Sequence, residues 1–197
     1  MLKKLFLKIL QLLFCHINFR VKYIGLENLD KVDKCLVCPN HSHSMDPLWV
    51  YVKVKNMWIM AKAELFSNKF MIKLLKTYNV FPIKRGEKDA RSLIHAINIV
   101  KNNDHAKLLI FPEGTRIKKD KERGRAKIGP VYIAAKAGVP IVPVYITKNP
   151  KLFSSPKVIF GEPIEVSQDI IDDKKKMQDF SNELLDKIYN LKEKGNK

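Results

Sequence analysis

The sequence predicts an α/β fold with one domain. Short apolar runs alternate along the chain with amphipathic stretches, which is the pattern of strands and helices that pack in layers. Several of the runs are apolar at every position, as expected for a mixed, mostly buried sheet flanked by helices. The chain has 197 residues, 46% of them hydrophobic, a length that supplies one sizeable core and is too short for two full domains.

Six segments are expected to form strands, because each is a short apolar run bounded by polar or turn-forming residues. They are Cys35–Pro39, Met57–Ala61, Val80–Ile83, Lys107–Phe111, Ile141–Ile146 and Val158–Phe160.

Five helices are expected from amphipathic spacing, and two of them have clear end signals. Asp46-Pro47 is read as an N-cap followed by an N1 proline, and Gly138 is a natural residue to end the fourth helix. The predicted helices are Leu48–Val54, Leu65–Tyr78, Asp89–Asn102, Lys127–Ala137 and Gln168–Lys194.

Residues 1–19 read MLKKLFLKILQLLFCHINF and form a segment of their own. On a helical wheel Lys4 and Lys8 share a narrow polar sector, and leucine, isoleucine and phenylalanine fill the rest. The least interrupted part, Leu5–Ile17, would be roughly 20 Å long, short of the roughly 30 Å hydrocarbon core of a bilayer. No clear small-residue cleavage site follows it, which argues against a secretory signal. We expect residues 1–20 to form an amphipathic membrane-interface helix; a terminal helix packed on the chain's own core is the alternative.

The chain carries 37 basic and 20 acidic residues, a net charge of +17. This excess indicates an anionic partner, such as a phosphorylated small molecule, nucleic acid or an acidic membrane face. The sequence contains no nucleic-acid-binding motif and no basic strip interleaved with aromatic residues, so we expect no nucleic acid partner. Only 6 of the basic residues are arginine, which makes the positions of the arginines informative.

The three cysteines, Cys15, Cys35 and Cys38, are an odd number with no disulfide framework, which suits a reducing compartment. Cys35 and Cys38, followed by His41 and His43, superficially resemble a metal or redox cluster. However, positions three apart in a strand point to opposite faces. We therefore expect buried core thiols and no metal site.

The segment Asn40–Pro47 follows a predicted strand and opens a helix, where α/β folds place functional groups. His41 lies five residues before Asp46, so the loop can fold back until the carboxylate meets the imidazole. That contact fixes the tautomer of the ring, which a general base requires. From these residues alone, a helix cap at Asp46 with an unrelated loop histidine at His41 explains the pattern as well as a general base does.

Two further strand ends carry a scarce arginine. Phe111–Arg116 combines a glutamate, a glycine and Arg116, a set that suits an anionic substrate, because arginine binds phosphate through two hydrogen bonds. A tight turn with a surface ion pair is the alternative. The run Val80–Gly86 ends beside Arg85, which by itself reads as a solvated strand end.

Taken in order and at their spacing, these motifs resemble the glycerolipid acyltransferase family, which includes the 1-acyl-glycerol-3-phosphate acyltransferases. The resemblance runs from about Tyr23 to Glu165. The matching segments are Asn40-His41 with Asp46 (the NHx4D motif), Ala61–Leu65 (AKxEL), Lys84–Gly86, Phe111–Arg116 and Val139–Pro143.

The resemblance implies an enzyme that moves a fatty acyl group from acyl-CoA or acyl carrier protein to the free hydroxyl, at sn-2, of lysophosphatidic acid. His41, oriented by Asp46, would take the hydroxyl proton; no GxSxG motif is present to form an acyl-enzyme. The reaction that the resemblance implies requires no cofactor and no metal. The residues that match the family's remaining site positions are Lys62 and the Gly114 N–H for the oxyanion, and Arg85, Thr115 and Arg116 for the substrate phosphate, with Glu113 positioning that substrate site.

The resemblance also implies an acyltransferase domain over residues 21–197, at the cytoplasmic face of the cell membrane as a peripheral or monotopic protein. An anionic membrane surface would then be a partner. The basic segment Lys118–Lys127 would meet an acyl carrier protein, the phosphates of coenzyme A or anionic lipid, or would be a solvated loop.

Three alternatives stay open at this point. The His-Asp motif is shared with enzymes that act on glycerol-3-phosphate or on another lysophospholipid. A cationic binding protein without catalysis would explain the charge, but not why arginines stand at strand ends beside His41 and Glu113. His43 occupies a position where the family often has serine, and a second imidazole there would compete for a proton or alter acceptor preference.

Overall fold

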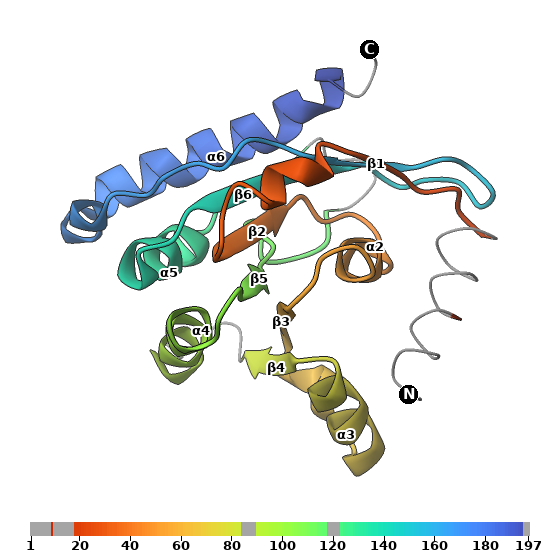
Figure 1. Ribbon diagram of the computed structural model, residues 1–197, viewed down its shortest axis with the longest axis horizontal. Coiled ribbons are helices and arrows are strands. Elements are labelled where there is room, and N and C mark those ends of the chain that lie inside the picture. Colours follow the sequence, from red (N-terminus) through yellow and green to blue (C-terminus); the bar gives the residue numbers. More distant parts are fainter. Residues whose placement is uncertain (1–8, 10–17, 84–89, 118–122, 195–197) are drawn as a thin grey trace.

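A seven-stranded sheet forms the centre of the molecule, with helices on both faces (Figure 1). The structure is a computed structural model that describes residues 9, 18–83, 90–117 and 123–194. Most of the predicted helix over residues 1–20, all of Lys84–Gly86 and the first part of Lys118–Lys127 therefore lie outside the described residues.

The sheet is mixed, as predicted, with the order β1-β7-β6-β2-β5-β3-β4. Strands β6 and β7 pair antiparallel, and every other neighbouring pair is parallel. The strands are β1 (Lys22–Ile24), β2 (Cys35–Pro39), β3 (Met57–Lys62), β4 (Val80–Ile83), β5 (Lys107–Leu109), β6 (Ile141–Ile146) and β7 (Lys157–Phe160).

Helices α4, α5 and α6 cover one face of the sheet, and α2 and α3 lie on the other (Figure 1). The α-helices are α2 (Asp46–Tyr51), α3 (Lys69–Thr77), α4 (Ala90–Asn102), α5 (Gly129–Ala137) and α6 (Lys174–Lys194). Three short 3-10 helices complete the described elements: η2 (Leu26–Leu29), η3 (Ala63–Phe66) and η4 (Gln168–Asp172). None of the helices in the described part of the chain is both long enough and apolar enough to span a bilayer.

The six predicted strands are confirmed to within two residues at their ends, and the three-residue strand β1 was not predicted. The helix predicted over Leu65–Tyr78 is instead η3 followed by α3, because Asn68 caps a new helix: its side-chain oxygen accepts a hydrogen bond from the Met71 N–H at 2.9 Å. The helix predicted over Gln168–Lys194 also divides, at Asp173, whose carboxylate accepts the N–H groups of the first turn of α6.

Strand β2 shows how the sheet is buried on both sides. Leu36 and Cys38 pack in the core under α4, α5 and α6, whereas Cys35 and Val37 pack in the core under α2. The two thiols therefore point to opposite faces and are buried, as predicted from their spacing. Burial raises the pKa of Cys35 from 9.0 to about 12, so this thiol stays protonated at neutral pH.

Candidate active site

The sequence motifs meet at the carboxyl ends of three neighbouring strands. His41 follows β2, the segment Phe111–Arg116 follows β5, and Lys62 is the last residue of β3. Because β2, β5 and β3 lie side by side and run parallel, these loops share one edge of the sheet. This edge is where open α/β sheets bind their ligands.

Asp46 is fully buried and organises the loop that carries His41. Its Oδ2 atom accepts three hydrogen bonds: from His41 Nδ1 at 2.9 Å and from the backbone N–H groups of Ser42 and His43, both at 2.8 Å. Asp46 is the first residue of α2, whose N-cap is Met45, so the predicted N-cap position is off by one residue. Its carboxylate faces back to the loop, and the plain-cap interpretation is wrong because no side-chain capping bond is present at this helix start.

The carboxylate of Asp46 fixes the tautomer of His41. A carboxylate that receives two backbone N–H groups is an acceptor, so Nδ1 of His41 carries the proton and Nε2 keeps its lone pair. The imidazole also stacks on Phe111, with ring centroids 3.9 Å apart and 23° between the planes. His41 therefore has the tautomer and the restricted orientation that proton abstraction at Nε2 requires.

Glu113 links the loop after β5 to the loop after β2. It is 3% exposed, and its Oε2 accepts the backbone N–H of His41 at 2.9 Å. Its Oε1 accepts the Gly124 N–H at 2.7 Å and the Tyr189 hydroxyl at 2.8 Å. The Ile117 N–H in turn donates to the His41 carbonyl at 2.8 Å. Both backbone groups of His41 are thus held by the loop after β5.

A cavity of about 500 Å³ lies beside His41 and contains most of the remaining predicted residues. Lys62, Thr115 and Arg116 line it, and all three are exposed. Apart from His41 and Ser44, the rest of the wall is apolar and includes Met60 and Leu65. The cavity therefore offers cationic and apolar surface together, a combination that fits an amphipathic anion.

Two predicted site residues stand apart from this arrangement. The Gly114 N–H donates to the Phe111 carbonyl at 2.9 Å, so an oxyanion would have to compete with that bond for the donor. Gly114 has φ +70°, a left-handed conformation that explains glycine at this turn. Arg85 lies outside the described residues, and its assignment to the phosphate stays a prediction.

His43 is occupied by contacts within the protein. Its Nδ1 accepts the Met45 N–H at 3.2 Å, and its ring stacks on Trp49, with centroids 5.5 Å apart and 4° between the planes. Phe19 packs edge-on against both rings. With one nitrogen engaged and both ring contacts aromatic, His43 serves the packing of the loop, which the sequence did not indicate.

Two residues that tie the site together were not assigned roles from the sequence. Asn40 is fully buried, and its carboxamide donates to the Ile146 carbonyl at 3.0 Å and accepts the Ile146 N–H at 2.7 Å, which joins the ends of β2 and β6. Tyr189 reaches Glu113 from α6, 76 positions further along the chain. The amphipathic spacing that predicts this helix gave no signal that Tyr189 has a polar role.

Among the described residues, no group of three or more histidine, cysteine or acidic side chains could hold a metal ion. His41, which the sequence placed near a possible cysteine cluster, is hydrogen-bonded to Asp46. The two cysteines of β2 are enclosed in separate parts of the core.

The largely parallel sheet carries at its carboxyl edge a histidine that is hydrogen-bonded to a fully buried aspartate, as the acyltransferase motifs led us to expect. The profile of the family described as Acyltransferase matches residues 20–147. The chain belongs to this acyltransferase family, which confirms the resemblance drawn from the motifs.

Within this family, the chain is similar to proteins that are named as 1-acyl-sn-glycerol-3-phosphate acyltransferases. The chain is 33% identical to the 1-acyl-sn-glycerol-3-phosphate acyltransferase of Streptococcus pneumoniae over 85% of its own length and 62% of that protein. It is 32% identical to the enzyme of the same name from Bacillus subtilis, over 73% of each chain. The crystal structure of the 1-acyl-sn-glycerophosphate acyltransferase PlsC from Thermotoga maritima superimposes with a TM-score of 0.66 at 25% identity, covering 87% of this chain and 72% of that one. The fold is therefore shared with a solved acyltransferase, while the chain spans under two thirds of the pneumococcal relative.

Proposed function

We propose that the protein transfers a fatty acyl group from a thioester, acyl-CoA or acyl carrier protein, to the sn-2 hydroxyl of 1-acyl-glycerol-3-phosphate, which yields phosphatidic acid. The observation that carries the proposal is the 2.9 Å hydrogen bond between His41 and the buried Asp46, with His41 on the wall of a cavity that Arg116 also lines. Relatives named for this activity at 32–33% identity support the choice of acceptor.

In the proposed reaction, His41 Nε2 takes the proton of the acceptor hydroxyl as the oxygen attacks the thioester carbonyl carbon. The carbonyl oxygen becomes an oxyanion, and Lys62, at the end of β3 on the same cavity wall, is the cation available to it. The tetrahedral intermediate then expels the thiolate, which takes the proton from His41 and leaves as the thiol. The ester bond forms and the thioester bond breaks without a covalent acyl-enzyme.

Arg116 and Thr115 are proposed to bind the acceptor phosphate, together with Arg85. Within the described residues, Arg116 forms no ion pair and no side-chain hydrogen bond, so its guanidinium is available to an anion. A guanidinium pairs with phosphate through two parallel hydrogen bonds. The apolar wall formed by Met60 and Leu65 then suits the acyl chains that accompany the polar groups.

An acceptor panel tests this proposal. Purified protein is given labelled acyl-CoA or labelled acyl carrier protein, with 1-acyl-glycerol-3-phosphate, glycerol-3-phosphate or an uncharged lysolipid as acceptor. The expected product is phosphatidic acid from the first acceptor only. Labelling of glycerol-3-phosphate alone would contradict the proposed acceptor, and no labelled lipid with either donor would contradict the proposed reaction.

We further propose that the enzyme works at the cytoplasmic face of the membrane, against anionic lipid. Leu65, on the cavity wall, is 50% exposed, and Phe70, on α3, is 73% exposed. Lys69 and Lys73 lie beside Phe70 on the same exposed helix. Apolar side chains flanked by lysines favour an anionic interface, and one of these apolar side chains, Leu65, also lines the cavity proposed for the lipid substrate.

Vesicle sedimentation tests the membrane proposal. Binding to vesicles that contain anionic lipid is expected to weaken on deletion of residues 1–17 and on Phe70→Ser. The deletion stops before Phe19, which is 5% exposed and belongs to the core. Ile94→Ser is the matched control, because Ile94 is 57% exposed on α4. Unchanged binding of both altered proteins would contradict the proposal.

A further inference from the structure

Helix α6 contacts Glu113 of the Phe111–Arg116 motif at one point and the segment that follows the motif at two. Tyr189 donates to Glu113 Oε1 at 2.8 Å, and the same oxygen accepts the Gly124 N–H. Arg123 pairs with Asp186, one helical turn before Tyr189. Gln178 Nε2 donates to the Ala126 carbonyl at 3.3 Å. The segment 123–126 is therefore clamped between Glu113 and one face of α6.

The close approach at Gly124 indicates a built contact. A Cβ atom at this position would lie 2.4 Å from Ile117 Cδ1 and 3.1 Å from the Cβ and Cγ of Glu113. A side chain here would have to displace the end of Ile117 and press on Glu113, so glycine favours the bond between this backbone N–H and the Glu113 carboxylate.

A buried carboxylate needs its donors, because each unsatisfied lone pair in a water-poor site costs free energy. Glu113 is 3% exposed and takes two of its donors from backbone and one from Tyr189. Tyr189 remains a donor over the physiological range, because burial and the facing Glu113 carboxylate raise the pKa of its hydroxyl above the ordinary 10.0.

The remaining oxygen of Glu113 is the one bonded to the backbone N–H of His41. A shift of the carboxylate therefore moves the residue that carries the proposed base, even though Tyr189 does not touch the cavity. Because proton transfer depends steeply on geometry, a displacement well under 1 Å is enough to lower the rate.

We propose that Tyr189 is a positioning residue of the acyl-transfer site, acting through Glu113 on the backbone of His41; the proposal rests on the function proposed above for His41. The hydroxyl of Tyr189 is the active element, and its ring serves the packing against Tyr145, whose centroid lies 6.1 Å away. The C-terminal helix thereby becomes part of the site without contributing a group to the substrate.

The test compares Tyr189→Phe with Tyr145→Phe. Both remove one hydroxyl from a tyrosine of the same ring pair, and among the described residues the hydrogen bonds to the Glu113 carboxylate come from His41, Gly124 and Tyr189, not from Tyr145. Tyr189→Phe is expected to lower kcat about 5- to 30-fold, with the KM for 1-acyl-glycerol-3-phosphate within about twofold, since the loss of one hydrogen bond to a charged group acts on geometry and leaves the phosphate contacts in place. Tyr145→Phe is expected to keep kcat within about twofold.

A nuclear magnetic resonance measurement makes the test independent of turnover. The backbone amide and imidazole resonances of His41 are expected to shift in Tyr189→Phe and to stay in place in Tyr145→Phe. Tyr189→Leu separates the hydroxyl from the ring: the proposal requires that Tyr189→Phe already carries most of the loss in kcat.

Unshifted His41 resonances with an unchanged kcat in Tyr189→Phe would overturn the inference. So would full activity in Tyr189→Phe together with loss in Tyr189→Leu, because the ring alone would then matter. If the unaltered protein shows no acyl transfer while the resonance shifts are found, the proposed function fails and the link from Tyr189 to His41 stands.

Discussion

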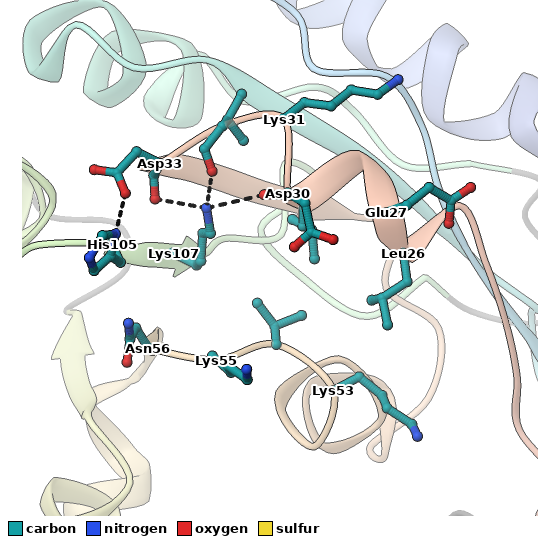
Figure 2. Close-up of a pocket in the computed structure, with 13 residues that line it drawn as sticks. Leu26, Glu27, Asp30, Lys31, Asp33, Lys53, Lys55, Asn56, His105 and Lys107 are labelled. Carbon is teal, nitrogen blue, oxygen red and sulfur yellow. Dashed lines mark hydrogen bonds and ion pairs between the residues drawn. The ribbon is translucent and has the colours of Figure 1, made fainter.

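The two ends of the central parallel strands each border a cavity, and the larger one is at the end without the motifs. The cavity at the amino ends measures about 760 Å³, against about 500 Å³ at the carboxyl ends. In the larger cavity, Lys107 is 8% exposed, and its ammonium donates to the carbonyls of Leu29, Val32 and Asp33 (Figure 2). All three of its N–H donors are thus used by the protein itself.

Some of the other charges of the amino-end cavity are paired as well, whereas Lys55 is exposed there without an ion pair among the described residues. His105 bonds Asp33, as Figure 2 shows, and Lys31 pairs with Glu162 at 2.6 Å. At the carboxyl end the buried charges are acidic, and the charges that face the cavity are basic. The buried charges of Asp46 and Glu113 hold backbone, whereas Lys62 and Arg116 have no ion-pair partner among the described residues and face the cavity. The available charges of the carboxyl-end cavity are both cationic and lie beside His41, whereas the amino-end cavity is also lined by Glu27 and Asp30. The sign and placement of the available charges therefore mark the candidate site, and cavity volume is a poor guide to it.

Asp46→Asn tests the rigid base at the carboxyl end and has the largest expected effect. The neutral amide weakens the orientation of His41, so kcat is expected to fall about 10²- to 10⁴-fold, the usual contribution of general base catalysis. Steady-state kinetics measure the fall, and thermal unfolding checks that the variant is folded. A folded variant with a kcat within threefold of the unaltered enzyme would show that the carboxylate is a structural feature only.

Lys107→Met tests the amino end, where a stability effect without a catalytic one is expected. The three carbonyls lose their charged donor, which should lower the free energy of unfolding by about 2–3 kcal/mol. Urea unfolding measures this value. Lys55→Met is the matched control, since Lys55 is exposed at the same cavity, and should change stability by no more than about 0.5 kcal/mol. If folded Lys107→Met had a tenfold lower kcat, the amino end would also serve catalysis, which would contradict the assigned difference between the two ends.

Arg116→Ala removes an available charge from the carboxyl-end cavity. The KM for the lysophosphatidate acceptor is expected to rise about tenfold, equivalent to about 1.4 kcal/mol, because one phosphate contact is lost. Stability should stay the same, since Arg116 is exposed. Lys55→Ala, at the other cavity, should leave the KM unchanged. An equal effect of the two substitutions would mean that long-range charge, and not a phosphate contact, governs acceptor binding.

Cys35→Ala has the smallest expected effect. Cys35 lies in β2, opposite Lys107 of β5. Burial raises the pKa of the folded thiol from 9.0 to about 12, against a weaker opposite influence of Lys107. The folded state therefore holds the proton more tightly than the unfolded state, so this contribution to stability is complete below pH 9 and is lost as the pH rises toward 12. The stability gap between the unaltered protein and Cys35→Ala should narrow by about 1 kcal/mol between pH 8 and pH 10. Urea unfolding at the two pH values measures it; a constant gap would contradict the assignment.

What the sequence predicts well is local. The continuous apolar run of β2 and the spacing of His41 and Asp46 are both consequences of neighbouring residues, and both predictions agree with the structure. Gly138 likewise ends α5 with φ 68°, as its position after an apolar helix predicts.

The features that the sequence does not predict depend on contacts between distant residues, or on side chains that cap a new helix inside a predicted one. Asn68 and Asp173 divide two predicted helices because their side chains cap a new start, which the apolar spacing hides. The link from Tyr189 to Glu113 requires α6 to return to the sheet edge, and Lys107 looks like an exposed strand end until η2 and the loop behind it cover the side chain. No local pattern contains that information.

The most direct test of the central claim is the transfer of a labelled acyl group to 1-acyl-glycerol-3-phosphate by His41→Ala. His41 is only partly buried at the cavity wall, so the variant should fold normally. Phosphatidic acid formation is expected to fall at least about 10²-fold, while the unfolding temperature stays within a few degrees. Near-normal transfer by folded His41→Ala would contradict the central claim.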